Sequence, residues 1–366
     1  MSMLMELDSW AMTGPSVMAF ASICQCLERI SETEERTRAL AQMQQTLAGW
    51  PARSCQFTSL FPDHPAWSLA RSLSLNLEQW PWGGELYPND WYDDTHLDGE
   101  FDPDWFAELM YDPLCAQRMW YAIAEAIQHQ SMRALEWLGL EGMEFPATRW
   151  LSSVPSLRSI SLSNFHLSEP FPEMPELQTL KLCDVTWDEP IEDLLVNLGN
   201  LEHLVWEAES TLGGVISVAP MSSLQTLCVR GIRPLHWDSL TELKKLEWRN
   251  APPLEGRWMD EGSLTQLGSL ELLVWLGPGL TPSLRGLQSL SELREMTLGT
   301  LSLDSFEGLA TLPRLSFVDL SRADVQNALL RLPEPLVAFL KERDFVLESR
   351  EDVEILQMVL KKQLSS

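Results

Sequence analysis

A short phrase, Leu-x-x-Leu-x-Leu, recurs through the middle of the chain and constrains the fold more than any other feature. It occurs about nine times at intervals of 19 to 27 residues, and the copies begin at Leu135, Leu157, Leu177, Leu201, Leu224, Leu243, Leu270, Leu293 and Leu315. A period of this length is typical of units that contain one strand and one returning segment. Stacked units bury together what none can bury alone, so the phrase predicts an α/β solenoid with a parallel sheet on one face. A long open sheet surface favours binding over chemistry.

Residues 131 to 325 therefore resemble a leucine-rich repeat array of the superfamily that includes ribonuclease inhibitor. The copies are irregular, since tryptophan replaces the third leucine at Trp206, Trp248 and Trp275. The asparagine ladder of the family, three residues past the last strand leucine, is replaced by apolar residues at Met143, Phe165, Val185, Ile232 and Leu301. The resemblance implies a protein that binds other proteins through the strand face of the solenoid.

Strand alternation sends the leucines inward and the intervening residues outward. A local basic spot then forms from Arg230, Lys245 and Arg249, beside an apolar patch at Leu272, Val274 and Leu276. Either a neighbouring loop or the C-terminal cap covers that patch, or it is a binding hot spot. The predicted partner-binding residues are Trp137, His203, Val205, Arg230, Lys245, Arg249, Leu272, Val274, Leu276, Phe317 and Asp319.

The chain is expected to have three parts: a mainly helical N-terminal region (1–131), the solenoid (132–325) and a helical C-terminal cap (326–366). Helical spacing predicts helices at 16–29, 32–48 and 113–130, and Ser31 with Glu34 forms a capping box that would open the second of these. Residues 69–77 alternate like a strand and are interpreted as a degenerate first coil. Residues 336–364 are predicted to be mainly helix.

An insertion within the first part, residues 78–108, carries ten acidic residues, no Lys or Arg, and many aromatic rings. The rings either cap the exposed apolar end of the solenoid or anchor a partner that the acids steer. In the second case the insertion is a secondary partner loop, formed by Trp82, Trp91, Tyr92, Asp93, Asp94 and Phe101.

The net charge bears on which partners the chain can bind, and the cysteines bear on the compartment in which it is expected. The chain has 53 acidic and 26 basic residues, a formal net charge of -27, which repels nucleic acid phosphates and anionic membranes. The surplus either keeps a Leu- and Trp-rich protein soluble or suits a basic partner. Six cysteines without paired spacing indicate reduced thiols in a cytoplasmic protein. Glu6 and Asp8, without a basic start, do not suggest a signal peptide, and no apolar run reaches membrane-spanning length.

No motif for a nucleophilic serine, a phosphate-binding loop, a zinc site or a dinucleotide fold occurs in the sequence, so neither an enzyme nor a cofactor nor a metal is expected. The leading hypothesis is a cytoplasmic protein that binds another protein through the strand face of the solenoid. The more specific version of this hypothesis is an acidic inhibitor, adaptor or immunity-type partner of a basic enzyme or toxin. The alternative is a regulatory or substrate subunit that a partner enzyme recognises through the insertion at 78–108.

Overall fold

The structure is a computed structural model of the 366-residue chain. It describes residues 3–57, 69–76, 135–145, 148–167, 169–187, 194–208, 215–236, 239–249, 266–276, 289–299, 309–321 and 334–364. The chain divides into two compact units, Met1–Glu176 (unit 1) and Leu177–Ser366 (unit 2), which are described separately. The predicted boundaries at 131 and 325 stay predictions.

Unit 1 begins with three helices, α1 (Met3–Met12), α2 (Val17–Glu28) and α3 (Thr33–Leu47). The predicted helices at 16–29 and 32–48 are thus found, but the cap expected for the second of them is not. The Ser16 hydroxyl accepts a hydrogen bond from the Ala19 amide at 3.1 Å and caps α2. The capping box predicted at Ser31 is wrong, because α3 has no side-chain cap. Instead the Arg36 guanidinium donates to the Ile30 carbonyl, with Nε at 2.8 Å.

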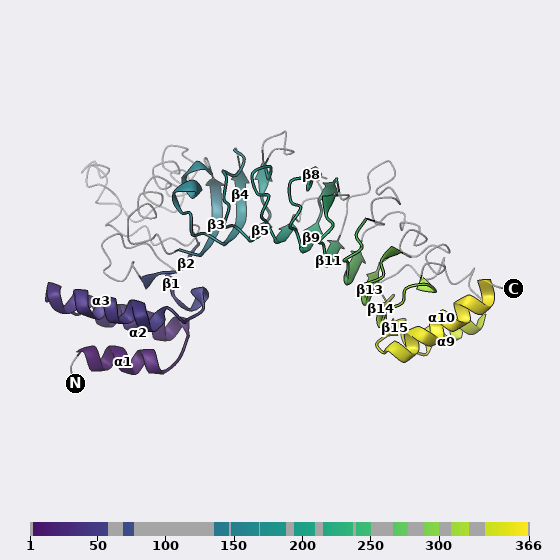
Figure 1. The fold of residues 1–366 in the computed structure, drawn as a ribbon, viewed down its shortest axis with the longest axis horizontal. Coiled ribbons are helices and arrows are strands. Elements are labelled where there is room, and N and C mark those ends of the chain that lie inside the picture. Colours follow the sequence, from purple (N-terminus) through teal and green to yellow (C-terminus); the bar gives the residue numbers. More distant parts are fainter. Residues whose placement is uncertain are drawn as a thin grey trace, which may run out of the picture. The chain divides into compact units, whose positions relative to one another are not determined.

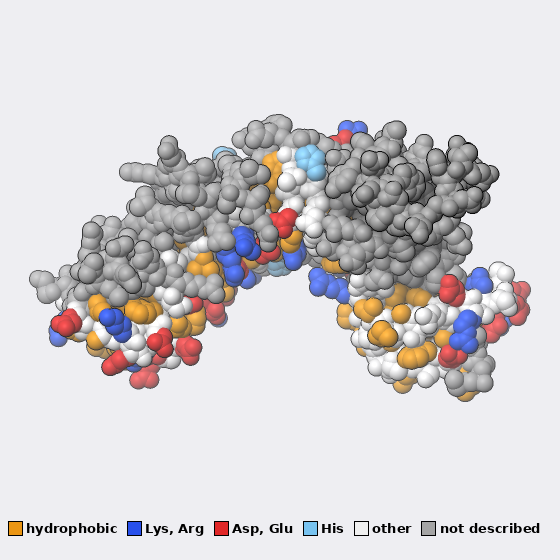
Figure 2. All heavy atoms as spheres, turned by 180° about the vertical axis from the view of Figure 1, so that it is seen from behind, with side chains coloured by type: hydrophobic (Ala, Val, Ile, Leu, Met, Phe, Trp, Pro, Cys, Tyr) orange, Lys and Arg blue, Asp and Glu red, His pale blue; other side chains and the backbone are white. Residues whose placement is uncertain are grey.

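Helix α1 was not predicted, and its presence leaves apolar side chains on the surface of unit 1. The large exposed apolar residues of α1 and the start of α2 are Met5, Trp10, Met12, Val17 and Met18. Figure 2 shows apolar side chains gathered over these N-terminal helices. The opposite sides of the helices form a core that includes Leu7, Phe20, Ile23 and Met43.

The strands of unit 1 are β1 (Gln56–Phe57), β2 (Ser72–Asn76), β3 (Trp137–Phe145) and β4 (Ser159–Leu167), all paired in parallel in that order (Figure 1). Short 3-10 turns lie at Ala52–Ser54 and Arg149–Ser153. Leu73 pairs with Leu138, which confirms that the 69–77 segment is a first coil of the array. The predicted helix at 113–130 lies outside the described residues.

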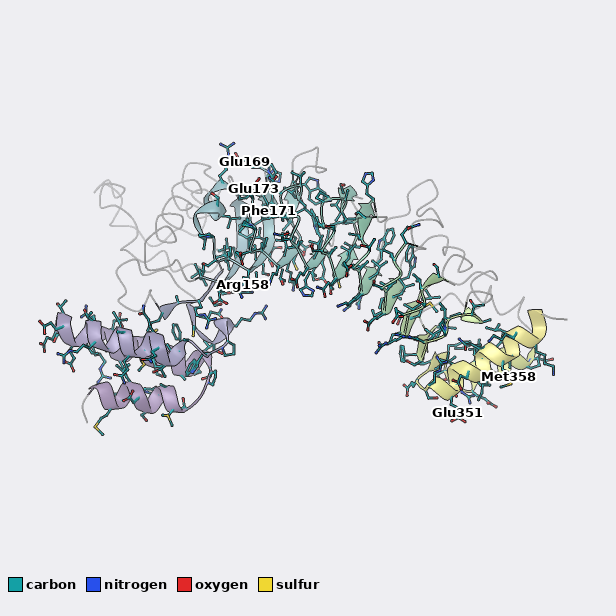
Figure 3. The ribbon with its side chains drawn as sticks, viewed as in Figure 1. Arg158, Glu169, Phe171, Glu173, Glu351 and Met358 are labelled. Carbon is teal, nitrogen blue, oxygen red and sulfur yellow. The ribbon has the colours of Figure 1, made fainter. Side chains whose placement is uncertain are left out.

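The segment that returns from β4 alternates between core and solvent. Phe171 is fully buried, whereas Glu173 is exposed and Glu169 pairs with Arg149 at 3.2 Å (Figure 3). The Thr148 hydroxyl donates a hydrogen bond to the carbonyl of Pro170, which lies in this segment. Phe171 therefore fills the core on this side of its repeat.

The main strands of unit 2 are β5 (Thr179–Cys183), β7 (His203–Glu207), β9 (Thr226–Arg230), β11 (Lys245–Arg249), β12 (Leu272–Leu276), β13 (Glu295–Leu298) and β14 (Phe317–Asp319). They pair in parallel in this order, with no shift in register from copy to copy. Shorter pieces are β6 (Thr186–Trp187), β8 (Val215–Ser217) and β10 (Arg233–Leu235), and β8 pairs with β10. This is the leucine-rich repeat fold that the phrase predicted.

Main-chain hydrogen bonds join each coil to the next in one recurring pattern. The amides of Glu202 and His203 both donate to the Gln178 carbonyl, and the amides of Gln225 and Thr226 both donate to the Glu202 carbonyl. The same double donation recurs at Lys244–Lys245, Glu271–Leu272, Arg294–Glu295 and Ser316–Phe317. Since each copy repeats it, the register does not depend on any particular side chain.

All three leucine-type positions of the nine phrases are buried, and the tryptophans follow the same rule. Trp206 is 0% exposed and lies edge-to-face with Trp187, with ring centroids 4.9 Å apart. Trp248 and Trp275 pair across β11 and β12, with centroids 4.6 Å apart. Each indole fills the space of a leucine and its neighbours, so the larger side chain is an inward substitution and not an outward binding group.

The missing asparagine ladder has a physical counterpart in unit 2. Val185 and Ile232, which stand in ladder positions, are 2% and 1% exposed. The residue before each of them, Asp184 or Gly231, has a positive φ of 50° or 73°. The strand therefore ends in a left-handed residue, a conformation that Asp and Gly tolerate, and an apolar side chain then enters the core. Leu301 lies outside the described residues.

The C-terminal cap contains α9 (Glu334–Lys341), β15 (Val346–Leu347) and α10 (Arg350–Leu364). The prediction that 336–364 is mainly helix is confirmed, and the two helices are separated by a turn in which Asp344 and Phe345 have positive φ. Strand β15 then pairs antiparallel with β14 and terminates the sheet.

Helix α10 lies against this end of the sheet. Its Gln357 side chain, 8% exposed, donates to the Leu309 carbonyl at 3.0 Å and to the Leu312 carbonyl at 2.9 Å. Glu351 and Met358 lie on its exposed side (Figure 3). No helix in the described part of the chain is long and apolar enough to cross a membrane.

Candidate binding surface on the strands of unit 2

The outward residues of the main strands form one continuous surface on unit 2, here called the strand face. The alternation in burial matches the prediction: in β12, Leu273 and Trp275 are buried, whereas Leu272, Val274 and Leu276 stay partly accessible. The remaining outward residues are Thr179, Lys181, Cys183, His203, Val205, Glu207, Thr226, Cys228, Arg230, Lys245, Glu247, Arg249, Glu295, Thr297, Gly299, Phe317, Asp319 and Ser321.

The strand face carries no net charge, although the chain as a whole carries -27. Its cations are Lys181, Arg230, Lys245 and Arg249, and they are balanced by as many carboxylates, Glu207, Glu247, Glu295 and Asp319. The acidic surplus of the chain therefore lies outside this surface.

The predicted basic spot lies on β9 and β11, but a carboxylate stands within it. Register places Arg230 beside Arg249, and Glu247 lies on β11 between Lys245 and Arg249. Lys245 Nζ is 3.1 Å from Glu247 Oε2, and the Arg249 guanidinium pairs with Glu247 Oε1. The Glu247 side chain is only 15% exposed, against 48% for Arg249.

The pKa values of two groups at this spot, Glu247 of β11 and Cys228 of β9, are shifted by their surroundings. Burial alone would raise the pKa of Glu247, but hydrogen bonding from Lys245 and the charge of Arg249 outweigh it, and the pKa lies below its ordinary value. Burial also raises the pKa of Cys228 to about 11, so its thiol stays protonated and donates to Glu247 Oε2 at 3.7 Å. Glu247 is therefore ionised at neutral pH, and the spot retains a local excess of positive charge.

The apolar patch consists of all three outward residues of β12. Leu272 stands between Lys245 of β11 and Glu295 of β13, while Val274 stands between Glu247 and Thr297. Cover of the patch by the C-terminal cap receives no support from the described contacts, since α10 packs against β14 and β15. Cover by a neighbouring loop stays a prediction, because residues 250–265, 277–288 and 300–308 lie outside the described residues. The patch remains partly accessible and has charge of opposite sign on its two sides.

The remaining predicted residues lie at the two ends of the strand face. On β7, His203 and Val205 are half-buried, and the register places Val205 between Lys181 of β5 and Cys228 of β9. His203 stands between Thr179 and Thr226. On β14, Phe317 pairs with Glu295, and Asp319 Oδ1 accepts hydrogen bonds from the Ser321 amide at 2.9 Å and the Ser321 hydroxyl at 2.6 Å. Asp319 is therefore held in a turn with its charge on the face.

Trp137 is the one predicted residue of the strand positions that lies in unit 1, on β3. A Cβ atom added at Gly139 would lie 2.3 Å from the Trp137 ring, so the indole occupies the space next to that glycine. The Arg53 guanidinium is 5.3 Å from the ring centroid, within the range of a cation–π contact. Trp137 thus has contacts within its own unit.

Two carboxylates of the strand face, Glu247 and Glu295, are absent from the predicted partner-binding residues. Glu247 was read only as an outward residue, and Glu295 was not connected with Leu272, although the constant register of the phrases places position three of each copy beside position three of the next. The predicted secondary loop (Trp82, Trp91, Tyr92, Asp93, Asp94 and Phe101) lies outside the described residues. Among the residues that are described, no three His, Cys, Asp or Glu come together as a metal site.

Comparison with known proteins gives similarities in structure alone. No protein-family model matches the chain. No curated protein matches it either. Solved structures that it resembles include the leucine-rich repeat ectodomain of the plant membrane receptor kinase GASSHO1/SCHENGEN3 from Arabidopsis thaliana, in complex with CASPARIAN STRIP INTEGRITY FACTOR 2, with 17% identity and a TM-score of 0.30 over 54% of this chain and 28% of that one.

Two bacterial structures are similar to the same extent. A leucine-rich repeat protein of Leptospira interrogans has 15% identity and a TM-score of 0.28 over 54% of this chain and 63% of that one. The functional domain of InlJ from Listeria monocytogenes has 12% identity and a TM-score of 0.27 over 54% and 53%. The chain thus spans less than two thirds of each of these structures. The leucine-rich repeat fold follows from the strand register and the buried leucines, not from these similarities.

Proposed function

We propose that this chain is a non-catalytic interaction protein that binds a partner protein through the strand face of unit 2. The observation that carries the proposal is the apolar patch on β12. Three adjacent apolar side chains, Leu272, Val274 and Leu276, stay partly accessible on a sheet whose other outward positions are mostly polar. A cluster of accessible apolar residues with a charged rim is the usual composition of a protein-binding hot spot.

The net charge supports a finer proposal about the partner. A chain of charge -27 attracts a basic protein over a distance of about one Debye length, and this speeds encounter more than it strengthens the final complex. An acidic inhibitor, adaptor or immunity-type partner of a basic enzyme or toxin fits that charge. Since the strand face itself is neutral, docking there would depend on local contacts. A cytoplasmic location is proposed on the six cysteines, which have no paired spacing in the sequence.

The test is a double substitution in the patch, Leu272→Glu with Val274→Glu, used with the wild-type chain to purify partners from the native source. We expect proteins that the wild type retains to be lost with the double variant. Binding would bury two new carboxylates against an apolar surface of the partner protein, which offers no opposite charge or hydrogen-bond donor to compensate their lost hydration. Far-UV circular dichroism and thermal unfolding of the variant should stay close to those of the wild type.

A matched control adds the same two charges away from the patch. Thr241 and Ser291 are exposed in turns that precede β11 and β13, so Thr241→Glu with Ser291→Glu should keep the partner. A partner retained equally by all three proteins would show that the strand face is not the binding surface. If the patch variant unfolds while the control does not, Leu272 and Val274 belong to the core and the proposal is wrong.

A further inference from the structure

The strand face changes character in one direction, from basic through apolar to acidic, across neighbouring strands. Strands β9 and β11 carry three cations against the single carboxylate of Glu247, strand β12 carries only apolar side chains, and strands β13 and β14 add Glu295 and Asp319. Neither of these two carboxylates forms an ion pair with another described residue, so their charge faces outward uncompensated.

We propose that the segment of the partner that contacts this surface carries a carboxylate, an apolar side chain and a cation in that order along its length. This inference rests on the proposed function, and it names the chemistry of the partner at that surface. The carboxylate would lie against Arg249 and Arg230, the apolar side chain would pack between Leu272 and Leu276, and the cation would lie against Glu295.

The spacing along the partner follows from the sheet. Parallel strands lie about 4.8 Å apart, so β11 and β13 are separated by about 10 Å. Arg249 stands level with Leu276, whereas Glu295 stands level with Leu272, four residues earlier along the strands, so the two charges are about 16 Å apart on the diagonal. An extended chain advances about 3.3 Å per residue, and a segment that follows this diagonal therefore places its own two charges about five residues apart. The apolar residue between them is then centred over β12.

Charge complementarity makes one order preferable to the others. A segment with both charges at the same end would bring a carboxylate to Glu295 or a cation to Arg249, and like charges in contact oppose binding. Arg249 is the more exposed cation of β11, at 48% of its side chain, and can turn to a ligand without leaving Glu247 unpaired, because Lys245 stays 3.1 Å from the same carboxylate.

The experiment uses two synthetic fluorescent peptides of identical composition, each with two glutamates, three leucines and two lysines, titrated into the full-length chain at low salt. In the ordered peptide the glutamates lie at one end, the leucines in the middle and the lysines at the other end. In the mixed peptide each end carries one glutamate and one lysine. We expect the ordered peptide to bind about tenfold more tightly, and the difference to shrink in about 0.5 M NaCl as exposed ion pairs are screened.

Protein variants assign the contacts. Glu295→Lys and Arg249→Glu should each weaken the ordered peptide about three- to tenfold and leave the mixed peptide nearly unchanged. Lys181→Glu, a charge reversal on distant β5, is the matched control and should leave both affinities within about twofold of the wild type, since it lies well beyond contact of the segment.

The outcomes separate this inference from the function on which it rests. Equal binding of both peptides, lost in both cases with Leu272→Glu and Val274→Glu, would overturn the proposed order and leave the binding surface in place. Binding that survives the patch substitutions would overturn both. An ordered peptide that does not bind at about 1 mM would also overturn the order, because it would show that complementary charges around the patch add no measurable affinity.

Discussion

Gly231, which directly follows strand β9, occupies a position that only glycine fits without strain. Its φ is +73°, and a Cβ atom placed on it would lie 2.6 Å from the carbonyl oxygen of Ala208 on the preceding coil. Its amide meanwhile donates to the Arg249 carbonyl at 3.1 Å. The residue is therefore held from both sides by main-chain atoms, and neither side can yield as a flexible side chain would.

We predict that Gly231→Ala destabilises unit 2 by about 2 kcal/mol, from the left-handed backbone together with the contact at Ala208. Urea unfolding followed by circular dichroism measures the change. Gly268→Ala is the control, because no atom lies within 4 Å of a Cβ at that position and its φ is not left-handed. An equal loss of stability in the two variants would show that the crowding at Ala208 has no effect.

Glu247 gives a prediction about pH. Its pKa in the folded chain lies below the ordinary value of 4.5, so its ion pairs stabilise the fold above that pH, and the contribution is lost as the pH falls through the lower folded value. The thermal midpoint of the wild type should therefore exceed that of Glu247→Gln at pH 6 to 8, and the difference should shrink as the solution is acidified below pH 4.5.

The control for this pH series is Glu242→Gln, an exposed carboxylate of the same coil for which the described residues show no ion pair. Its midpoint should follow the wild type throughout. A difference between wild type and Glu247→Gln that grows on acidification would contradict the assignment of an ionised, paired Glu247.

At the scale of an element, the N-terminal helices separate a sequence pattern from the contact that it suggests. Ser16 and Ser31 both precede a helix, but only the Ser16 hydroxyl accepts a hydrogen bond from a backbone amide of its helix, that of Ala19. At α3 the Arg36 side chain reaches back to the Ile30 carbonyl and holds the chain where a serine cap was expected. This contact ties down the chain that precedes α3, but a guanidinium only donates, so it does not supply the acceptor that a serine cap would give to the first amides of the helix.

We predict that Ser16→Ala costs about 1 kcal/mol of stability in unit 1, the usual value of an N-cap, whereas Ser31→Ala changes it by no more than a few tenths. Thermal unfolding of the two single variants makes the comparison, with the same residue type lost in each. A larger loss at Ser31 would mean that the capping box forms in solution after all.

The sequence predicted most of the repeat array because buried and outward positions alternate strictly, so one registered leucine assigns its whole copy. The reversal at Asp344 and Phe345 was not predictable in the same way. Neither residue is a glycine, yet both take a positive φ and turn a continuous helical pattern into α9, β15 and α10. The pairing of Glu247 with two cations was also missed, because strand alternation gives the side of a residue but not its rotamer.

At the scale of the whole molecule, the charge of -27 stands against the stability of the fold. Self-repulsion among surface carboxylates weakens the compact state, and salt screens it once the Debye length falls to about 10 Å at 0.1 M. We predict that raising NaCl from 10 to 300 mM at pH 7.5 increases the thermal midpoint by about 2–4 °C, as expected for about 1 kcal/mol.

The same salt series at pH 5, where part of the carboxylates are protonated, is the control and should give a smaller increase. A midpoint that falls with salt at pH 7.5 would indicate that attractive ion pairs outweigh the repulsion. The surface pairs of the chain, such as Arg294 with Glu271 at 3.8 Å, would then be more stabilising than exposed pairs usually are.

The double donation of main-chain amides between coils has a consequence for how such a chain can change over generations. Because peptide groups and inward leucines hold one coil on the next, the outward positions have little part in maintaining the register. Substitutions there can accumulate with small effects on folding while they alter what the sheet recognises. Two descendants of one ancestral chain could keep every buried leucine and tryptophan and still select unrelated proteins.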